Sequence, residues 1–185
     1  MITVDTREHL IPQIQDLLVT KIVGPEVPQF RFHCLPLADY LLENNNHSML
    51  IERKSISDFC GSYKELKSRL ARMRKTEYLR LGLILEGTYT IWDNHVCINE
   101  NGKLQPRMKY STMSNFLTHQ TALGIYLYHT MTLEETIWRL IYIHNYLPKL
   151  DVPTPTIKAG SATEWLAELP GMGPASLTKL KIAYS

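Results

Sequence analysis

The chain has few cysteines and no pattern that would join them. Cys34, Cys60 and Cys97 are the three cysteines among 185 residues, and no two stand in CxxC spacing. An odd number of widely spaced cysteines argues against a disulfide framework and against a structural zinc site. We therefore expect reduced, mostly buried thiols in an intracellular protein.

Long apolar runs and paired histidines are also missing. No stretch reaches the roughly 20 apolar residues that span a bilayer, and the N-terminal sequence MITVDTRE lacks the apolar core of a signal peptide. The seven histidines are scattered without an HxxxH pair, and the formal net charge is only +2. These absences favour a soluble protein with no membrane partner, long enough to fold without a metal or disulfide.

The sequence does contain an alternation of strand and helix patterns, which predicts an α/β architecture with a central sheet. Ser55 can cap one helix, and Thr132 with Glu135 forms a capping box for another. Residues 88–109 are predicted to be irregular, with a hairpin tip at NENGK. The expected strands are 2–5, 29–35, 39–43, 48–54, 81–87 and 125–130, and the expected helices are 8–21, 56–75, 111–123 and 133–147.

Composition divides the chain into three parts. Residues 1–147 hold the α/β pattern, and the proline-rich residues 148–160 read as a semi-rigid linker. Residues 161–185 predict two short helices around the glycine-rich turn PGMGP. We expect a main domain followed by a small all-α unit.

Four charges stand together in ERKSISD, at the junction of an expected strand and helix. Strand alternation puts Glu52 and Lys54 on one face and Arg53 on the other, and Asp39 can lie near Glu52 across the expected hairpin. Two carboxylates and an ammonium suit phosphodiester hydrolysis, because carboxylates hold Mg²⁺ and the ammonium stabilises developing charge. The alternative is a structural ion-pair cluster that joins Arg53 to Asp58 and Glu52 to Lys54.

An acid followed across a hairpin by acid-x-lysine is the pattern of the PD-(D/E)XK nuclease fold. When the longer motifs are included, the chain resembles the XPF family of structure-selective endonucleases. The resemblance covers nearly the whole chain and implies a restriction-endonuclease-like mixed sheet flanked by helices, with a helix-hairpin-helix tail. The motifs that carry it are VDTRE (4–8), LADY (37–40), ERKSISD (52–58), LILEG (83–87) and LPGMGPASLTKL (169–180).

The resemblance assigns roles to individual residues. It implies a Mg²⁺ site, in which Mn²⁺ can substitute, formed by Asp39, Glu52 and the main-chain carbonyl of Arg53, with Lys54 as the catalytic lysine. Glu8 is expected as a further ligand or a water-mediated contact. Asp5 belongs to the same strand end, and Arg53 is expected to form a supporting ion pair with Asp58.

Four departures from the family pattern stand out. Ala38 replaces the glycine before the aspartate, a modest change if φ is negative there. Lys67 and Ala71 stand at the family's Arg and Gln positions. We also expect no helicase domain before the first motif, and one helix-hairpin-helix motif instead of two.

Basic residues crowd the helix after ERKSISD and recur at the C-terminal end. They suit DNA phosphates, although a basic run is often only a solvated helix face and PGMGP can be an ordinary tight turn. The expected DNA contacts are Lys64, Lys67, Arg69, Arg72, Arg74, Gly171, Gly173, Lys179 and Lys181.

Two functions remain open at this point. The first is a metal-dependent endonuclease that cuts branched DNA (3′-flap, splayed-arm or nicked junction) near a single-strand/duplex junction. The second is a catalytically silent DNA-binding scaffold that supports an active partner. The family works as dimers, homotypic or heterotypic, so Trp138, Tyr142 and Tyr146 are either core residues or a dimer surface. The expected location is at DNA, in a nucleus or nucleoid.

Overall fold

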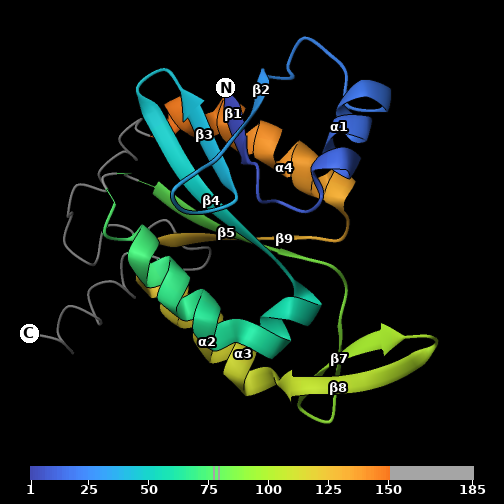
Figure 1. Cartoon of the computed structure of the whole chain (residues 1–185). Coiled ribbons are helices and arrows are strands. Elements are labelled where there is room, and N and C mark those ends of the chain that lie inside the picture. The colour runs from blue at the N-terminus through green and yellow to red at the C-terminus, as the bar shows by residue number, and fades with distance from the viewer. Residues whose placement is uncertain (77, 79, 151–185) are drawn as a thin grey trace, which may run out of the picture. The chain divides into compact units, whose positions relative to one another are not determined.

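The computed structural model describes residues 1–76, 78 and 80–150, and Met1–Pro148 form one compact unit. The predicted unit 161–185 and all but the first residues of the linker 148–160 lie outside the described residues. The elements, in chain order, are β1 (Ile2–Asp5), α1 (Ile11–Thr20), β2 (Phe30–His33), β3 (Tyr40–Asn44), β4 (His47–Ser55), α2 (Ile56–Met73), β5 (Arg80–Glu86), β6 (Thr90–Trp92), β7 (His95–Glu100), β8 (Lys103–Lys109), α3 (Tyr110–Ala122), β9 (Ile125–Thr130), α4 (Leu133–Tyr146) and a short 3-10 helix (Leu147–Lys149) (Figure 1).

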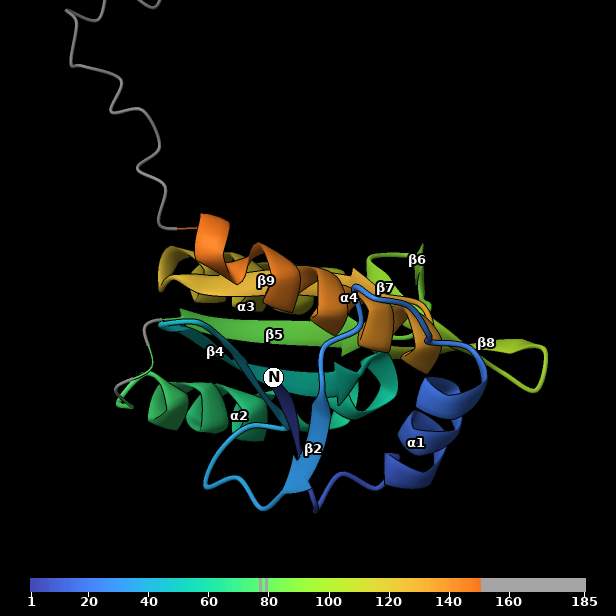
Figure 2. The same ribbon diagram turned by 90° about the horizontal axis from the view of Figure 1, so that it is seen from above.

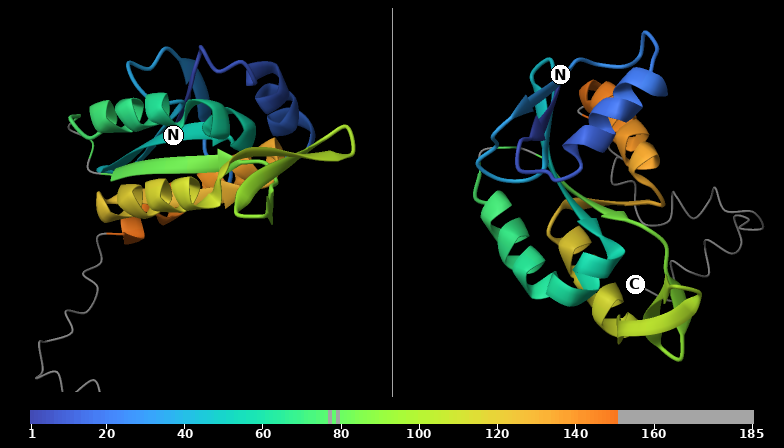
Figure 3. Two further views of the ribbon diagram at one scale, coloured as in Figure 1. Left: turned by 90° about the horizontal axis from the view of Figure 1, so that it is seen from below. Right: turned by 45° about the vertical axis from the view of Figure 1, so that its right-hand side comes forward.

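The main sheet has six strands in the order β2-β1-β3-β4-β5-β9. The β1–β3 and β3–β4 pairs are antiparallel, whereas β1–β2, β4–β5 and β5–β9 are parallel. Helices α2 and α3 cover one face, and α1 and α4 lie together on the other (Figures 1 and 3). Seen from above in Figure 2, β4 and β5 lie between α2 and α4. The predicted mixed sheet flanked by helices is confirmed.

The core forms where the apolar periods predict it. Strand β5 is buried along almost its whole length, as expected for a strand covered on both faces. Helix α2 buries Leu66, Leu70 and Met73 against the sheet. Both predicted caps are present: Ser55 Oγ accepts from the Asp58 N–H at 3.0 Å, and Thr132 Oγ1 from the Glu135 N–H at 3.2 Å.

The irregular interpretation of residues 88–109 is wrong, because β6, β7 and β8 form a separate antiparallel sheet. The tip between β7 and β8 contains Asn101 and Gly102, both with positive φ, in the predicted hairpin turn. A second tip joins β6 to β7 through Asp93 (φ 45°) and Asn94 (φ 57°). Asp and Asn tolerate this left-handed conformation, so the turn forms without a glycine to signal it.

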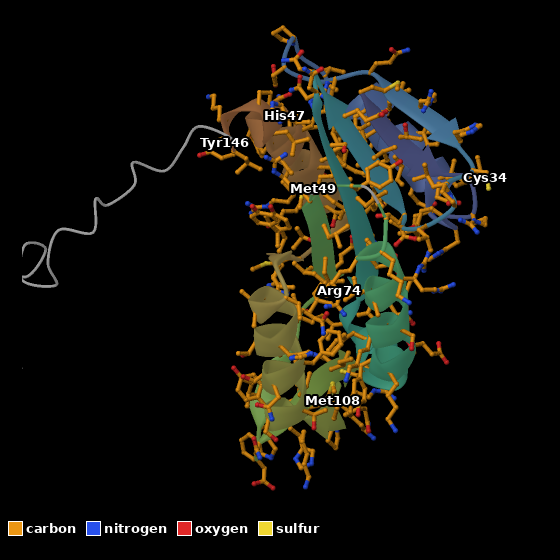
Figure 4. All side chains as sticks on the ribbon, turned by 90° about the vertical axis from the view of Figure 1, so that its left-hand side faces the viewer. Cys34, His47, Met49, Arg74, Met108 and Tyr146 are labelled. Carbon is orange, nitrogen blue, oxygen red and sulfur yellow. The ribbon has the colours of Figure 1, made fainter. Side chains whose placement is uncertain are left out.

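One expectation about burial fails, and one of two open alternatives is excluded for two residues. Only Cys97 is buried, whereas Cys60 is half-buried and Cys34 is exposed at the edge of the molecule (Figure 4). On α4, Tyr142 and Tyr146 are 61% and 55% exposed, so the core interpretation is wrong for both. Among the described residues, no helix is both long and apolar enough to cross a membrane.

Candidate active site

The β3–β4 hairpin fixes the position of Asp39 beside the ERK triplet. Tyr40 pairs with Ile51 in the antiparallel register, and the Asp39 N–H donates to the Ile51 carbonyl at 3.1 Å. The Asp39 Oδ2 atom accepts from the Arg53 N–H at 2.8 Å. Both bonds join Asp39 to β4, the strand that carries Glu52, and hold the Asp39 carboxylate against it.

The residue before Asp39 has an unusual backbone. Ala38 is fully buried and has φ +67°, so the condition under which the change from glycine would be modest is not met. A residue with a Cβ atom pays about 1–2 kcal/mol in this left-handed region. The family's glycine suits that conformation, and in this chain the Ala38 methyl instead packs in the hydrophobic core.

Glu52 is a buried carboxylate that is only partly satisfied. The residue is 1% exposed, and Oε1 lies 2.8 Å from Arg69 Nη1 in an ion pair. The Oε2 atom is buried and has no hydrogen-bond partner. Burial, together with the nearby Asp39 carboxylate, raises the pKa of Glu52 to about 8, although Arg69 and Lys54 oppose the rise.

Asp39 and Glu52 share one guanidinium group. Arg69 places Nη2 3.4 Å from Asp39 Oδ1, while its Nη1 contacts Glu52. Burial also raises the pKa of Asp39, against the opposing effects of the Arg53 N–H and of Arg69. The structure therefore brings the two predicted carboxylates to one cation, and that cation comes from α2.

Two neighbouring cavities are lined by Glu52, and the second of them also by Asp39. We call the first, of about 350 Å³, the outer cavity; it is lined by Arg7, Pro36, Leu37, Glu52, Lys54, Glu65, Leu66, Arg69 and Arg72. The second, of about 360 Å³, is the inner cavity, and Asp5, Glu8, Asp39 and Asp58 are among its lining residues. Glu52, Lys54, Arg7 and Arg69 line both cavities. Glu52 and Lys54 therefore reach the same cleft, as strand alternation predicts.

The side chain of Arg53 binds a different partner from the one expected. It is 7% exposed, and its Nε donates to Glu86 Oε2 at 2.9 Å, while Nη1 lies 3.9 Å from Glu8 Oε2. Asp58 is exposed in the first turn of α2. The expected Arg53–Asp58 ion pair is therefore wrong, because Glu86 at the end of the neighbouring strand takes the position of the partner.

Glu86 is a site residue that sequence reasoning missed. It accepts hydrogen bonds from Arg53 and, at 2.6 Å, from Thr136 Oγ1 of α4. Burial would raise the pKa of Glu86, but the hydrogen bonds from Arg53 and Thr136, with the charge of Arg53, outweigh it and leave that pKa below its ordinary value. The available signal was an acid at the end of an apolar strand, whereas its place beside Ser55 comes from the parallel register of the fold.

Asp5 and Glu8 are buried residues that line the inner cavity, each with its own partners. Asp5 accepts from the Arg7 side chain and from the Leu35 N–H at 3.0 Å, and the Arg7 hydrogen bonds lower its pKa to about 2. Glu8 Oε1 accepts from the Leu10 N–H at 3.2 Å and lies 3.1 Å from His9 Nδ1. The contacts of Asp5 thus tie the end of β1 to the loop after β2.

The donor set fits a hard divalent cation. Over residues 1–76, 78 and 80–150, no three His, Cys, Asp or Glu side chains gather as a metal-ligand group. Two carboxylates nevertheless converge, and the buried Glu52 Oε2 lacks a partner that a cation would supply. Mg²⁺ is commonly held by one or two carboxylates with several waters, and this pair fits that donor set.

The basic residues of α2 separate into two groups. Lys64, Lys67, Arg72 and Arg74 are exposed on α2 or at its C-cap, whereas Arg69 is half-buried and turned toward the carboxylates. The predicted contacts Gly171, Gly173, Lys179 and Lys181 lie outside the described residues.

The sheet, the hairpin and the charged cleft together define a mixed α/β domain of the XPF nuclease type. The chain belongs to the ERCC4 domain family, whose model matches residues 4–146. This is a family of structure-specific DNA endonucleases.

Solved structures support the fold. XPF from Aeropyrum pernix in complex with DNA matches with a TM-score of 0.56 and 22% sequence identity, over 99% of this chain and 80% of that one. A second structure of XPF from Aeropyrum pernix matches with a TM-score of 0.57, at the same identity and coverage. No protein of curated function matches this chain by sequence.

Proposed function

We propose that the chain is a divalent-metal-dependent endonuclease that cuts branched DNA near single-strand/duplex junctions. The observation that supports this most is the convergence of Asp39 and Glu52 on one cation, with Lys54 lining the same cleft. Mg²⁺ is the proposed metal, with Mn²⁺ as a substitute.

In this proposal each residue of the cleft has one role. Asp39 and Glu52 hold the metal, with the Arg53 carbonyl as a third ligand and Glu8 acting directly or through a water. When bound, the metal supplies charge neutralisation and lowers the pKa of a water ligand. Lys54 orients the attacking water and stabilises negative charge on the phosphate. Attack at phosphorus breaks the P–O3′ bond, leaving a 5′-phosphate and a 3′-hydroxyl.

Arg53, Asp5 and Asp58 have supporting roles in this proposal. The Arg53 N–H aims Asp39, and its buried side chain ties the strand to Glu86. Asp5 holds Arg7 at the mouth of both cavities. Asp58 stands in the first turn of α2, where a negative charge favours the helix.

The activity is tested with labelled 3′-flap, splayed-arm, nicked-junction and linear duplex DNA. We expect cleavage of one or more branched substrates with Mg²⁺ or Mn²⁺, little cleavage of linear duplex, and none with EDTA. DNA binding that depends steeply on salt, without cleavage in any metal, would instead support the scaffold function.

The exposed cations of α2 are proposed to contact DNA phosphates, with Gly171, Gly173, Lys179 and Lys181 as a second set. Each phosphate contact contributes about 0.9 to the slope of log K against log salt. We expect Lys67→Ala to reduce that slope by about 1, measured by fluorescence anisotropy with a flap substrate. Lys21→Ala, at the end of α1, is the control and should leave the slope unchanged. Equal slopes for Lys67→Ala and the wild type would remove Lys67 from the interface.

The exposed aromatics of α4 are proposed to form a dimer surface, homotypic or heterotypic. Trp138 stacks on the exposed Tyr142 with ring centroids 6.0 Å apart, and Tyr146 lies exposed on the next turn. For a homotypic dimer, we expect Tyr142→Glu to weaken self-association at least about tenfold, because it buries a charge in an apolar interface. Analytical ultracentrifugation measures this, and a wild-type chain that is monomeric at all concentrations would contradict it. The proposed location is at DNA, in a nucleus or nucleoid.

A further inference from the structure

Arg69 occupies an unusual position for a residue of a basic helix. Its guanidinium lies between the two carboxylates proposed to hold the metal, 2.8 Å from Glu52 Oε1 and 3.4 Å from Asp39 Oδ1. The other arginine of α2 that lines the outer cavity, Arg72, is exposed. Arg69 therefore differs from its neighbours by having an anionic partner already in place.

Arg69 covers the carboxylate pair from the solvent side. Its side chain is 36% exposed, compared with 14% for Asp39 and 1% for Glu52. Leu66 and Leu70, on either side along α2, are buried and fix the helix, so the reach of Arg69 comes from its long side chain. A cation that enters from the cleft meets the guanidinium first.

A divalent cation and this guanidinium compete for the same oxygens. Mg²⁺ binds carboxylate oxygens at about 2.0–2.1 Å and requires near-octahedral geometry. A guanidinium close to both carboxylates would lie near such an ion, and like charges at short range in a partly buried site repel strongly. Metal entry therefore requires the guanidinium to leave.

The outer cavity provides a place for the displaced side chain. Arg69 already lines it, together with Arg7, Lys54 and Arg72, against the acids Glu65 and Glu52. Arginine forks bind phosphate oxygens in two parallel hydrogen bonds, which makes such a cluster suited to a DNA phosphate.

We propose that Arg69 is a tethered counter-cation of the metal site. It pairs with Asp39 and Glu52 in the metal-free protein, moves away when the divalent ion binds, and then contacts a phosphate in the outer cavity. This rests on the proposed function, because it assumes that Asp39 and Glu52 are the metal ligands. It makes Arg69 a link between metal loading and the binding of the nucleic-acid backbone.

The test measures metal binding without DNA. The full chain is titrated with Mn²⁺, and free Mn²⁺ is followed by electron paramagnetic resonance at one fixed pH. We expect Arg69→Met, which keeps the length and removes the charge, to bind Mn²⁺ about tenfold more tightly than the wild type. Arg72→Met is the matched control, because Arg72 lines the same cavity and carries the same charge, and it should stay within about twofold.

A second variant covers the case in which Arg69→Met does not fold. Arg69→Lys keeps the charge but has a single ammonium, which cannot fork onto two carboxylates, so Mn²⁺ affinity should rise by a smaller factor. In addition, Mn²⁺ should raise the affinity of the wild type for a short uncleavable phosphorothioate duplex, and this increase should shrink in Arg69→Met.

The outcomes separate this inference from the function on which it rests. If Glu52→Gln weakens Mn²⁺ binding but the Arg69 variants bind no more tightly than the wild type, the counter-cation role is wrong and the metal site stands. If Glu52→Gln binds Mn²⁺ as well as the wild type does, the metal site itself is assigned to the wrong residues.

Discussion

Glu52→Gln should lower the rate of flap cleavage at least about 10²-fold while leaving the protein folded. The substitution keeps the size of the side chain and removes the charge that is proposed to hold the metal. Loss of one preorganised electrostatic element typically costs 10²–10³ in rate. Single-turnover cleavage with saturating enzyme measures the chemical step separately from DNA binding.

The fold should survive this change for a physical reason. Glu52 is a buried carboxylate beside a second one, and its Oε2 has no hydrogen-bond partner, so its charge adds little to stability. The glutamine carbonyl keeps an oxygen beside Arg69. We expect the melting temperature to change by no more than about 4 °C, which corresponds to about 1 kcal/mol for a chain of this size.

A matched control comes from the same hairpin. Glu43→Gln changes an acid at the other end of β3, where the strand pairs with Ser48, and should cleave at close to the wild-type rate. Wild-type cleavage by Glu52→Gln would remove Glu52 from the metal site. An equal loss in Glu43→Gln would mean that the hairpin, and not the carboxylate, is being tested.

Much of the fold could be predicted because its signals are local. The period of two in β2, the apolar run of β5 and the caps at Ser55 and Thr132 all depend on neighbouring residues. The second sheet was missed because Asp93 and Asn94 form its first turn without glycine, and a turn of this kind has a weak sequence signal. The exposure of Tyr142 stayed open because an apolar stripe does not reveal whether the sheet or another molecule covers it.

In the candidate site, too, the local features could be predicted from the sequence and the tertiary contacts could not. Glu52 and Lys54 could be placed on one face from strand alternation alone. The pairing of Arg53 with Glu86 depends on the register of two parallel strands that a helix separates, and nothing in the local sequence sets that register. The ion pair of Arg69 with Glu52 depends on how α2 lies across the sheet. The basic run in the sequence could therefore suggest DNA contacts but not this ion pair.

Arg53→Met should be the most damaging of the single substitutions for stability. The Arg53 side chain is 7% exposed, and its partners Glu86 and Glu8 are 12% and 4% exposed. Removing one partner of a buried ion pair typically costs about 3–5 kcal/mol, because the remaining charge is left without compensation. We expect the melting temperature to fall by on the order of 10 °C.

A double substitution and a control decide why stability is lost. Arg53→Met with Glu86→Gln should recover part of the stability, because the second change removes the uncompensated charge. Asp58→Asn should cost less than about 1 kcal/mol, since Asp58 is exposed and acts only near a helix N-terminus. Chemical denaturation of the four proteins measures these differences. A larger loss in Asp58→Asn than in Arg53→Met would mean that Asp58, and not Glu86, is the partner that stabilises Arg53 in solution.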